Sequence, residues 1–134
     1  MGFKFEDLEV WKLALEYTDS VYEMSSKLPR EEDFILKSQI RRAAPSIALN
    51  IAEGSTGQTD SEQARFLGLA LRSLVETVAC LRLIQKRRYL ATTDLDRLDK
   101  MANGLAAKLQ AFRKAIAPDQ KWLREEQFEY GAND

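Results

Sequence analysis

The chain has 134 residues, of which 45% are hydrophobic and 31% charged, and its formal net charge is −1. This composition fits one globular domain with a single core, and it excludes a mostly disordered chain and a strongly basic protein that binds nucleic acid indiscriminately. The sequence has no histidine, so the commonest general base near neutral pH and the commonest transition-metal ligand are both missing. We therefore predict a non-enzyme with no catalytic residues, no metal site and no cofactor.

The single cysteine, Cys80, lies in the apolar run of residues 78–81, which excludes an intrachain disulfide. This position favours a buried structural thiol over a nucleophile, and it indicates a reducing compartment. The sequence shows neither a charged-then-apolar signal segment nor an uninterrupted apolar stretch of about 18 residues. We expect a cytoplasmic protein.

The first two helices are expected over residues 7–28 and 33–53. Apolar residues spaced by three and four predict the inner face of the first helix at Leu8, Trp11, Leu15, Thr18 and Tyr22. Pro29 closes that helix. The same spacing predicts the inner face of the second helix at Leu36, Ile40, Ala43, Ile47 and Ile51, and Gly54 is expected just beyond its end in a left-handed conformation.

Pro45 is unusual because it falls inside the second helix, where a proline removes one hydrogen bond and costs about 3 kcal/mol or more. The helix should kink there or begin anew. The kink either wraps the helix around a bundle or exposes backbone carbonyls, Arg41 or Arg42 to a ligand. Asn50 and Glu53, one turn apart, are interpreted as a structural pair that satisfies backbone groups or bridges helices.

The third helix is expected from the capping-box pattern of residues 59–62 to about Arg88. Its apolar arc is wider than the ~100° of one buried face, which predicts burial on two sides and leftover surface for a homo-oligomer. The arc comprises Phe66, Leu67, Ala70, Leu71, Ser73, Leu74, Thr77, Val78, Cys80, Leu81 and Ile84.

The fourth helix is expected between a cap at Thr93 and Pro118. Its inner face alternates spacings of three and four: Leu95, Leu98, Ala102, Leu105, Leu109, Phe112 and Ile116. Gly68 in the third helix and Gly104 in the fourth are each interpreted as permitting a close helix approach, because an interior glycine costs about 1 kcal/mol relative to alanine.

No strand or hairpin pattern interrupts these segments. Four helices with short connections predict an all-α, antiparallel up-down four-helix bundle over residues 1–118. Residues 119–134 form a C-terminal tail that either packs as a short helix or dangles.

Charge is distributed unevenly along the chain. Residues 1–33 carry nine acidic and four basic side chains, whereas residues 34–88 carry nine basic and four acidic ones. The central segment can therefore present a positive face. Its arginines offer planar forks suited to phosphate oxygens, although a solvated face or pairing with a helix dipole is the alternative. The candidate nucleic-acid contacts are Arg41, Arg42, Arg65, Arg72, Arg82, Lys86, Arg87 and Arg88.

Three segments resemble a known bacterial family: DLEVWKLA at residues 7–14, SQIRRAA at 38–44 and SIALNIAEG at 46–54. They are similar to four-helix bundle proteins encoded in intervening sequences of 23S rRNA genes, and the similarity covers roughly residues 3–116. The resemblance implies a ring-shaped homo-oligomer, typically a pentamer, with no established enzymatic activity. The chain is also similar to the accessory variability determinant bundles of diversity-generating retroelements, which implies partnership with nucleic acid or a reverse transcriptase.

Two functions follow as hypotheses. The leading one is an oligomeric accessory protein associated with RNA or DNA through the basic central segment. The alternative is a protein-interaction scaffold without nucleic-acid binding, in which the acidic first helix or the tail faces a partner protein.

Overall fold

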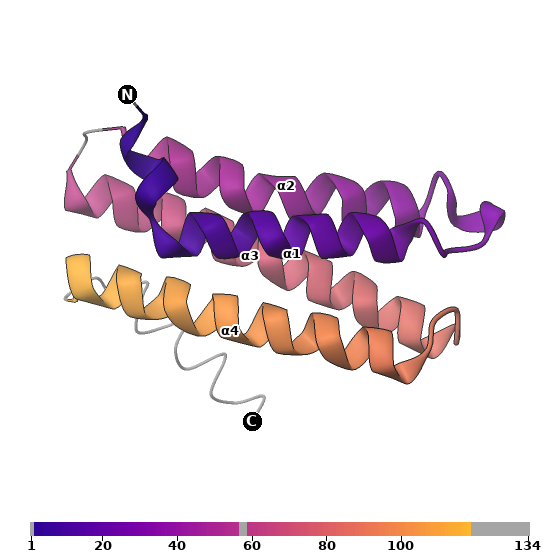
Figure 1. Cartoon of the computed structure of the whole chain (residues 1–134). Coiled ribbons are helices and arrows are strands. Elements are labelled where there is room, and N and C mark those ends of the chain that lie inside the picture. The colour runs from indigo at the N-terminus through magenta and orange to yellow at the C-terminus, as the bar shows by residue number, and fades with distance from the viewer. Residues whose placement is uncertain (1, 57–58, 119–134) are drawn as a thin grey trace.

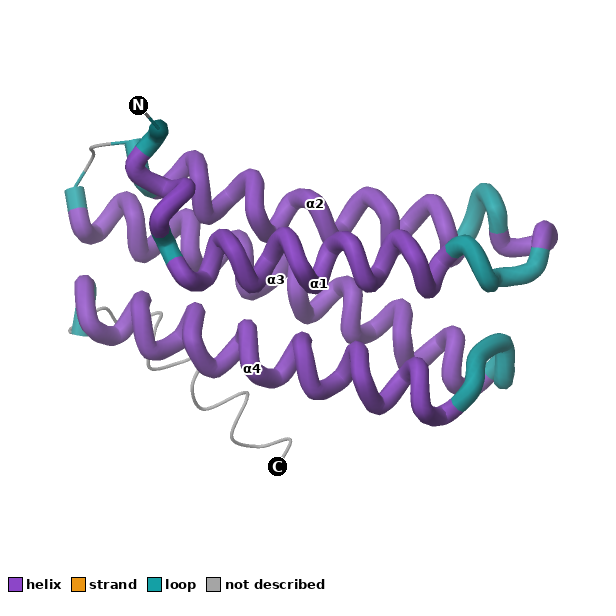
Figure 2. The backbone as a smooth tube through the Cα atoms, viewed as in Figure 1, coloured by secondary structure: helices purple, strands orange, loops and turns teal. Residues whose placement is uncertain are grey.

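The computed structural model describes residues 2–56 and 59–118, and within these ranges the secondary structure is entirely helical (Figures 1 and 2). The four α-helices are α1 (Glu9–Ser25), α2 (Leu36–Gly54), α3 (Asp60–Lys86) and α4 (Thr92–Ile116), and two short 3₁₀ helices are η1 (Lys4–Asp7) and η2 (Arg30–Glu32). Successive helices run in opposite directions along the bundle (Figure 1). The predicted four-helix bundle is confirmed. The prediction for the tail, residues 119–134, lies outside the described residues.

The helices occupy the four corners of the bundle. Both α1 and α3 pack against α2 and α4, so α1 and α3 lie at opposite corners. The predicted inner faces of α2 and α4 are confirmed, as is the burial of α3 on two sides. The whole arc of α3 is buried or half-buried inside this one chain. The prediction that this arc leaves apolar surface uncovered was therefore wrong. Because the arc is covered within one chain, it does not indicate an oligomer.

The predicted inner face of α1 was only partly right: Leu8, Trp11 and Thr18 are half-buried, and Leu8 and Trp11 pack against the core. Leu15 and Tyr22 are 43% and 42% exposed, whereas the buried residues are Val10, Ala14, Tyr17, Val21, Met24 and Ser25. Helix α1 carries two apolar stripes, the predicted one and the buried one. They occupy adjacent positions in the sequence, such as Leu15 and Ala14, and therefore lie about 100° apart around the helix. Only the neighbouring helices determine which stripe turns inward.

One polar contact crosses the core between the opposite corners. The hydroxyl of Tyr17 on α1 lies 2.8 Å from Oγ1 of Thr77 on α3, and both side chains are fully buried. Thr77 in turn donates to the carbonyl of Leu74 at 2.6 Å, so Tyr17 is the donor to Thr77. Burial raises the pKa of Tyr17 to about 12.

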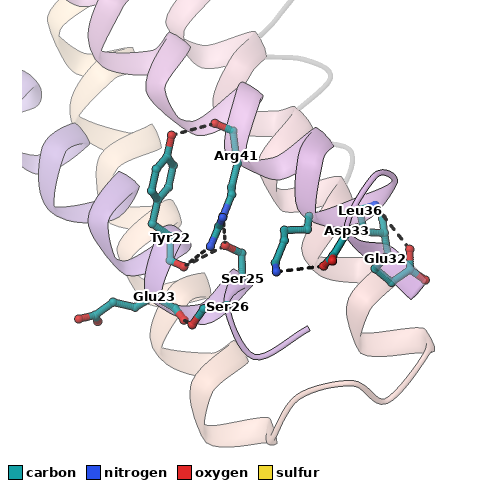
Figure 3. Close-up of polar contacts among 9 residues, drawn as sticks. Tyr22, Glu23, Ser25, Ser26, Glu32, Asp33, Leu36 and Arg41 are labelled. Atoms are coloured by element: carbon teal, nitrogen blue, oxygen red, sulfur yellow. Dashed lines mark hydrogen bonds and ion pairs between the residues drawn. The ribbon is translucent and has the colours of Figure 1, made fainter. Parts of the chain in front are cut away.

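Helix α2 continues through Pro45, so the expectation that it could begin anew there was wrong. A proline at this position leaves the carbonyl of Arg41, four residues earlier, without its helical donor. The hydroxyl of Tyr22 on α1 donates to that carbonyl at 3.3 Å (Figure 3). The carbonyl that a kink was expected to offer to a ligand is therefore used in α1–α2 packing.

The glycines differ in how closely their neighbours approach. Gly54 is the last residue of α2 and has no left-handed conformation, contrary to the prediction; a Cβ there would lie 2.8 Å from Cβ of Phe66 on α3. A Cβ on Gly68 would lie 2.7 Å from the guanidinium of Arg113, so this glycine makes room for a side chain and not for the close helix approach that was predicted. A Cβ on Gly104 would meet no neighbour within 4 Å, so the close approach predicted there was wrong.

The ends of α3 and α4 show three further features. Thr59 caps α3 by accepting from the backbone of Glu62 at 3.1 Å, as predicted. At the other end Arg88 takes a left-handed conformation, and the amides of Arg88 and Tyr89 close a Schellman motif onto α3. The cap of α4 is Ala91, so Thr93 was wrongly predicted as the cap.

Other sequence predictions concern single residues. Cys80 is buried, as predicted, and burial raises the pKa of its thiol. Asn50 donates to the carbonyl of Ser46 at 2.8 Å and so satisfies a backbone group, whereas Glu53 is exposed. Among the helices of residues 2–56 and 59–118, none combines the length and hydrophobicity needed to cross a membrane.

Candidate nucleic-acid interface

The eight predicted basic residues do not form one continuous face. Two lie on α2, two in the N-terminal half of α3, and the other four at or beyond its C-terminal part. Arg65 and Lys86 are separated by about 30 Å along α3, at 1.5 Å per residue. Each group has its own surroundings.

Arg41 lies between α1 and α2. Its Nε donates to Oγ of Ser25 at 2.6 Å, and its guanidinium lies over the Tyr22 ring, 5.4 Å from the centroid (Figure 3). These contacts place a cation at the C-terminal end of α1, where the helix dipole favours it. Arg42 is exposed and contacts Ser38 at 3.4 Å. Arg41 therefore holds two helices together and Arg42 faces solvent.

The basic residues at the C-terminal end of α3 mostly contact their own bundle. Arg82 places two guanidinium nitrogens on Asp99 of α4, at 3.1 and 3.2 Å. Arg87 donates to the hydroxyl of Tyr89 at 3.3 Å, and this hydrogen bond raises the pKa of Arg87. Tyr89 itself donates to Glu32 at 2.7 Å. Lys86 and Arg88 are exposed.

The N-terminal half of α3 provides a different environment. Arg65 and Arg72 line a cavity of about 310 Å³ between α3 and the C-terminal end of α4, where Arg113 is the third guanidinium. The remaining lining residues are Ser61, Glu62, Gly68 and Leu69. The structure thus joins two predicted residues with one that the sequence analysis missed.

Arg113 is buried to 1% exposure, which is unusual for a charged side chain. Gly68 makes room for it, because a side chain there would overlap the guanidinium. Its terminal nitrogen approaches Oε1 of Gln110 at 3.5 Å. The packing therefore holds this cation at the cavity wall.

Arg65 is more exposed and pairs with Glu62, with the nearest N–O distance 2.6 Å. Its guanidinium also lies over the Phe66 ring, 4.6 Å from the centroid. The hydrogen bond from Arg65 lowers the pKa of Glu62. The cavity wall thus carries three guanidiniums and the carboxylate of Glu62, which pairs with Arg65.

Arg113 was missed because the inner face of the fourth helix was continued through Phe112. Both residues follow Leu109 at helical spacing, and an apolar side chain is the default choice for a core position. The available signal was Gly68, an interior glycine in a helix rich in larger apolar residues. Its partner could not be identified without the packing of α3 on α4.

An anion is the ligand that this cavity suits chemically. Arginines present planar donor forks that match phosphate or carboxylate oxygens, and the Ser61 hydroxyl adds a further donor. A second cavity of about 510 Å³, beside η1 and the end of α2, has one lysine and one carboxylate in its wall, Lys4 and Glu53. In the part of the chain that the structure describes, no three acidic, cysteine or histidine residues gather as a metal site.

The fold and this cavity define an antiparallel four-helix bundle with an arginine-lined groove between α3 and α4. The family model described as 23S rRNA-intervening sequence protein matches residues 6–111, and the chain belongs to that family. A solved structure from Bacteroides thetaiotaomicron, a protein of unknown function from the S23 ribosomal protein family, is similar in fold. It is 23% identical, with a TM-score of 0.73 over 78% of this chain and 98% of the other. No curated protein matches the chain.

Proposed function

We propose that this protein is a homo-oligomeric bundle associated with nucleic acid, acting by binding and not by catalysis. The exposed Arg65 and Arg72 contact phosphates of the RNA or DNA backbone. The buried Arg113 forms part of the cavity wall behind that contact. The observation behind this proposal is that the guanidiniums of Arg65, Arg72 and Arg113 line the same cavity. Each arginine presents a planar fork of hydrogen-bond donors, and proteins that bind nucleic acid use such donors to contact the phosphate oxygens of its backbone.

Self-association strengthens such an interface. Two phosphate contacts in one chain are few, but copies joined in one assembly bind a polymeric ligand together with a higher effective concentration. Apolar side chains exposed on three helices offer surface for such an assembly. They are Leu15 and Tyr22 on α1, Leu49 on α2, and Val75 and Leu83 on α3.

The test compares two double variants that remove equal charge. Arg65→Ala with Arg72→Ala empties part of the cavity wall, whereas Arg87→Ala with Arg88→Ala removes two guanidiniums at the far end of α3. Binding of a generic DNA duplex and of a structured RNA is measured from low to physiological salt. For duplex DNA, each lost contact should flatten the salt dependence by about 0.9 log units. We expect the cavity variant to lose about two contacts and the matched variant fewer.

Gly68→Ala offers a finer test that keeps every charge. The new Cβ would sit 2.7 Å from the Arg113 guanidinium and must displace it. Affinity should fall in an assembly of unchanged mass. Equal losses in the two double variants would show a diffuse charge effect and refute the cavity site. An absence of binding to both ligands at low salt would refute nucleic-acid association and leave the protein-interaction scaffold as the better hypothesis.

A further inference from the structure

The bundle carries opposite charge on its two opposite corners. The exposed side of α1 includes Glu16, Asp19 and Glu23, with Lys12 as its cation. The exposed side of α3 includes Arg72 and Lys86 together with the carboxylates of Asp60 and Glu76, and Glu76 accepts a hydrogen bond from Gln39 of α2. Since α1 and α3 are diagonal partners, these two sides point away from each other and cannot meet within one chain.

Both sides also expose apolar side chains among these charges. On α1, Leu15 and Tyr22 are 43% and 42% exposed and lie seven residues apart. On α3, Val75 and Leu83 are 45% and 55% exposed and lie eight residues apart, with exposed Ala79 midway. At 1.5 Å per residue the two apolar pairs span about 10 and 12 Å, which are comparable lengths.

We propose that the outer side of α1 in one copy docks onto the outer side of α3 in the next copy. The two surfaces are called the acidic face (Lys12, Leu15, Glu16, Asp19, Tyr22 and Glu23) and the basic face (Arg72, Val75, Glu76, Ala79, Leu83 and Lys86). Their charges are complementary, and their apolar residues cover one another at matching spacing. A second copy is the occupant because this chain itself supplies both halves of the contact.

This contact is heterologous, because two different surfaces meet. Such contacts are repeated from copy to copy and close into a ring when the rotation between copies permits. The inference rests on the proposed self-association and adds to it the surfaces that meet. The cavity of Arg65, Arg72 and Arg113 adjoins the basic face at Arg72, so contact with the next copy lies beside the proposed phosphate site.

Charge reversal tests the pairing of faces. Glu16→Lys with Glu23→Lys reverses the acidic face, and Ala79→Glu with Lys86→Glu reverses the basic face; both pairs are exposed and two turns apart. Lys100→Glu with Asn103→Glu, on the exposed side of α4, is the matched control, since it changes the charge by the same amount as the basic-face variant. Mass is measured by light scattering and native mass spectrometry at micromolar concentration, with circular dichroism to verify folding.

We expect the wild type and the control to be oligomeric, and each face variant alone to be folded and of lower mass. An equimolar mixture of the two face variants should regain a larger assembly, because each reversed face then meets a complementary one. Face variants that keep the wild-type mass, or a mixture that stays dissociated, would overturn the pairing while leaving self-association intact. A monomeric wild type would overturn both. Nucleic-acid binding is read separately, through Gly68→Ala, which changes no residue of either face.

Discussion

The buried contact between Tyr17 and Thr77 gives a quantitative test of the core. Replacing Thr77 with Val keeps the shape but removes the acceptor of the Tyr17 hydroxyl, which is fully buried. An unsatisfied buried hydroxyl costs about 1–3 kcal/mol. For a chain of this size, a loss of about 2 kcal/mol lowers Tm by roughly 7 °C.

Replacing Tyr17 with Phe should cost less, about 0.5–1.5 kcal/mol, because Thr77 keeps its bond to the carbonyl of Leu74. Combining both substitutions removes donor and acceptor together. The double variant should therefore be more stable than Thr77→Val alone, which is a favourable coupling between the two sites. Urea unfolding at neutral pH measures all four proteins of this cycle. A double variant less stable than Thr77→Val would refute the hydrogen-bond assignment.

The same tyrosine predicts a loss of stability in alkali. Burial raises its pKa to about 12 from an ordinary value of 10. Between these values the unfolded chain releases the proton and the folded chain holds it, so stability is complete below pH 10 and falls as the pH rises toward 12. Two pKa units correspond to at most about 3 kcal/mol. The difference in unfolding free energy between wild type and Tyr17→Phe should shrink from pH 9 to pH 11, and a constant difference would contradict the pKa.

Three further substitutions or measurements test local features. Tyr22→Phe should cost about 0.5–1 kcal/mol in thermal unfolding, and less in a Pro45→Ala background, where residue 45 regains an amide for the Arg41 carbonyl; equal costs in both backgrounds would contradict the role assigned to the Tyr22 hydroxyl. Arg88→Gly should stabilise the protein by about 1 kcal/mol, because glycine adopts the left-handed conformation without strain, and a destabilised variant would show that the Arg88 side chain has a structural role. Cys80 should react slowly with a thiol reagent in the folded protein and rapidly in denaturant, since it is buried and its pKa is raised; fast native labelling would show local opening.

The agreement between predicted and observed inner faces differs from helix to helix. Helices α2 and α4 each have one apolar stripe, and their inner faces were predicted correctly except at the end of α4, where Arg113 is more deeply buried than Phe112 and Ile116. Helix α1 has two stripes, and the sequence pattern favoured the one that contains Leu15 and Tyr22. The structure buries the one that contains Tyr17 and Val21. Periodicity therefore predicts the buried face of a helix only where the helix has a single apolar stripe.

The candidate site shows the same limit. Arg65 and Arg72 were identified from sequence because basic residues on one helix can be placed by spacing alone. Arg113 lies more than forty residues from Arg65 in the chain, and the two share a cavity because α3 and α4 pack side by side with Gly68 leaving room between them. Pro45 is a similar case: the sequence indicated the loss of one helical hydrogen bond, but the donor that reaches the Arg41 carbonyl comes from another helix.

Local periodicity, turn residues and contiguous motifs were enough to predict the all-α class, the family and the four helices of the described residues. Packing between helices selects which stripe of α1 is buried, brings arginines of α3 and α4 to one cavity, and places the acidic and basic helices at opposite corners. These features depend on pairs of residues far apart in the chain. Their proximity is set by packing between helices, which local spacing along one helix does not specify.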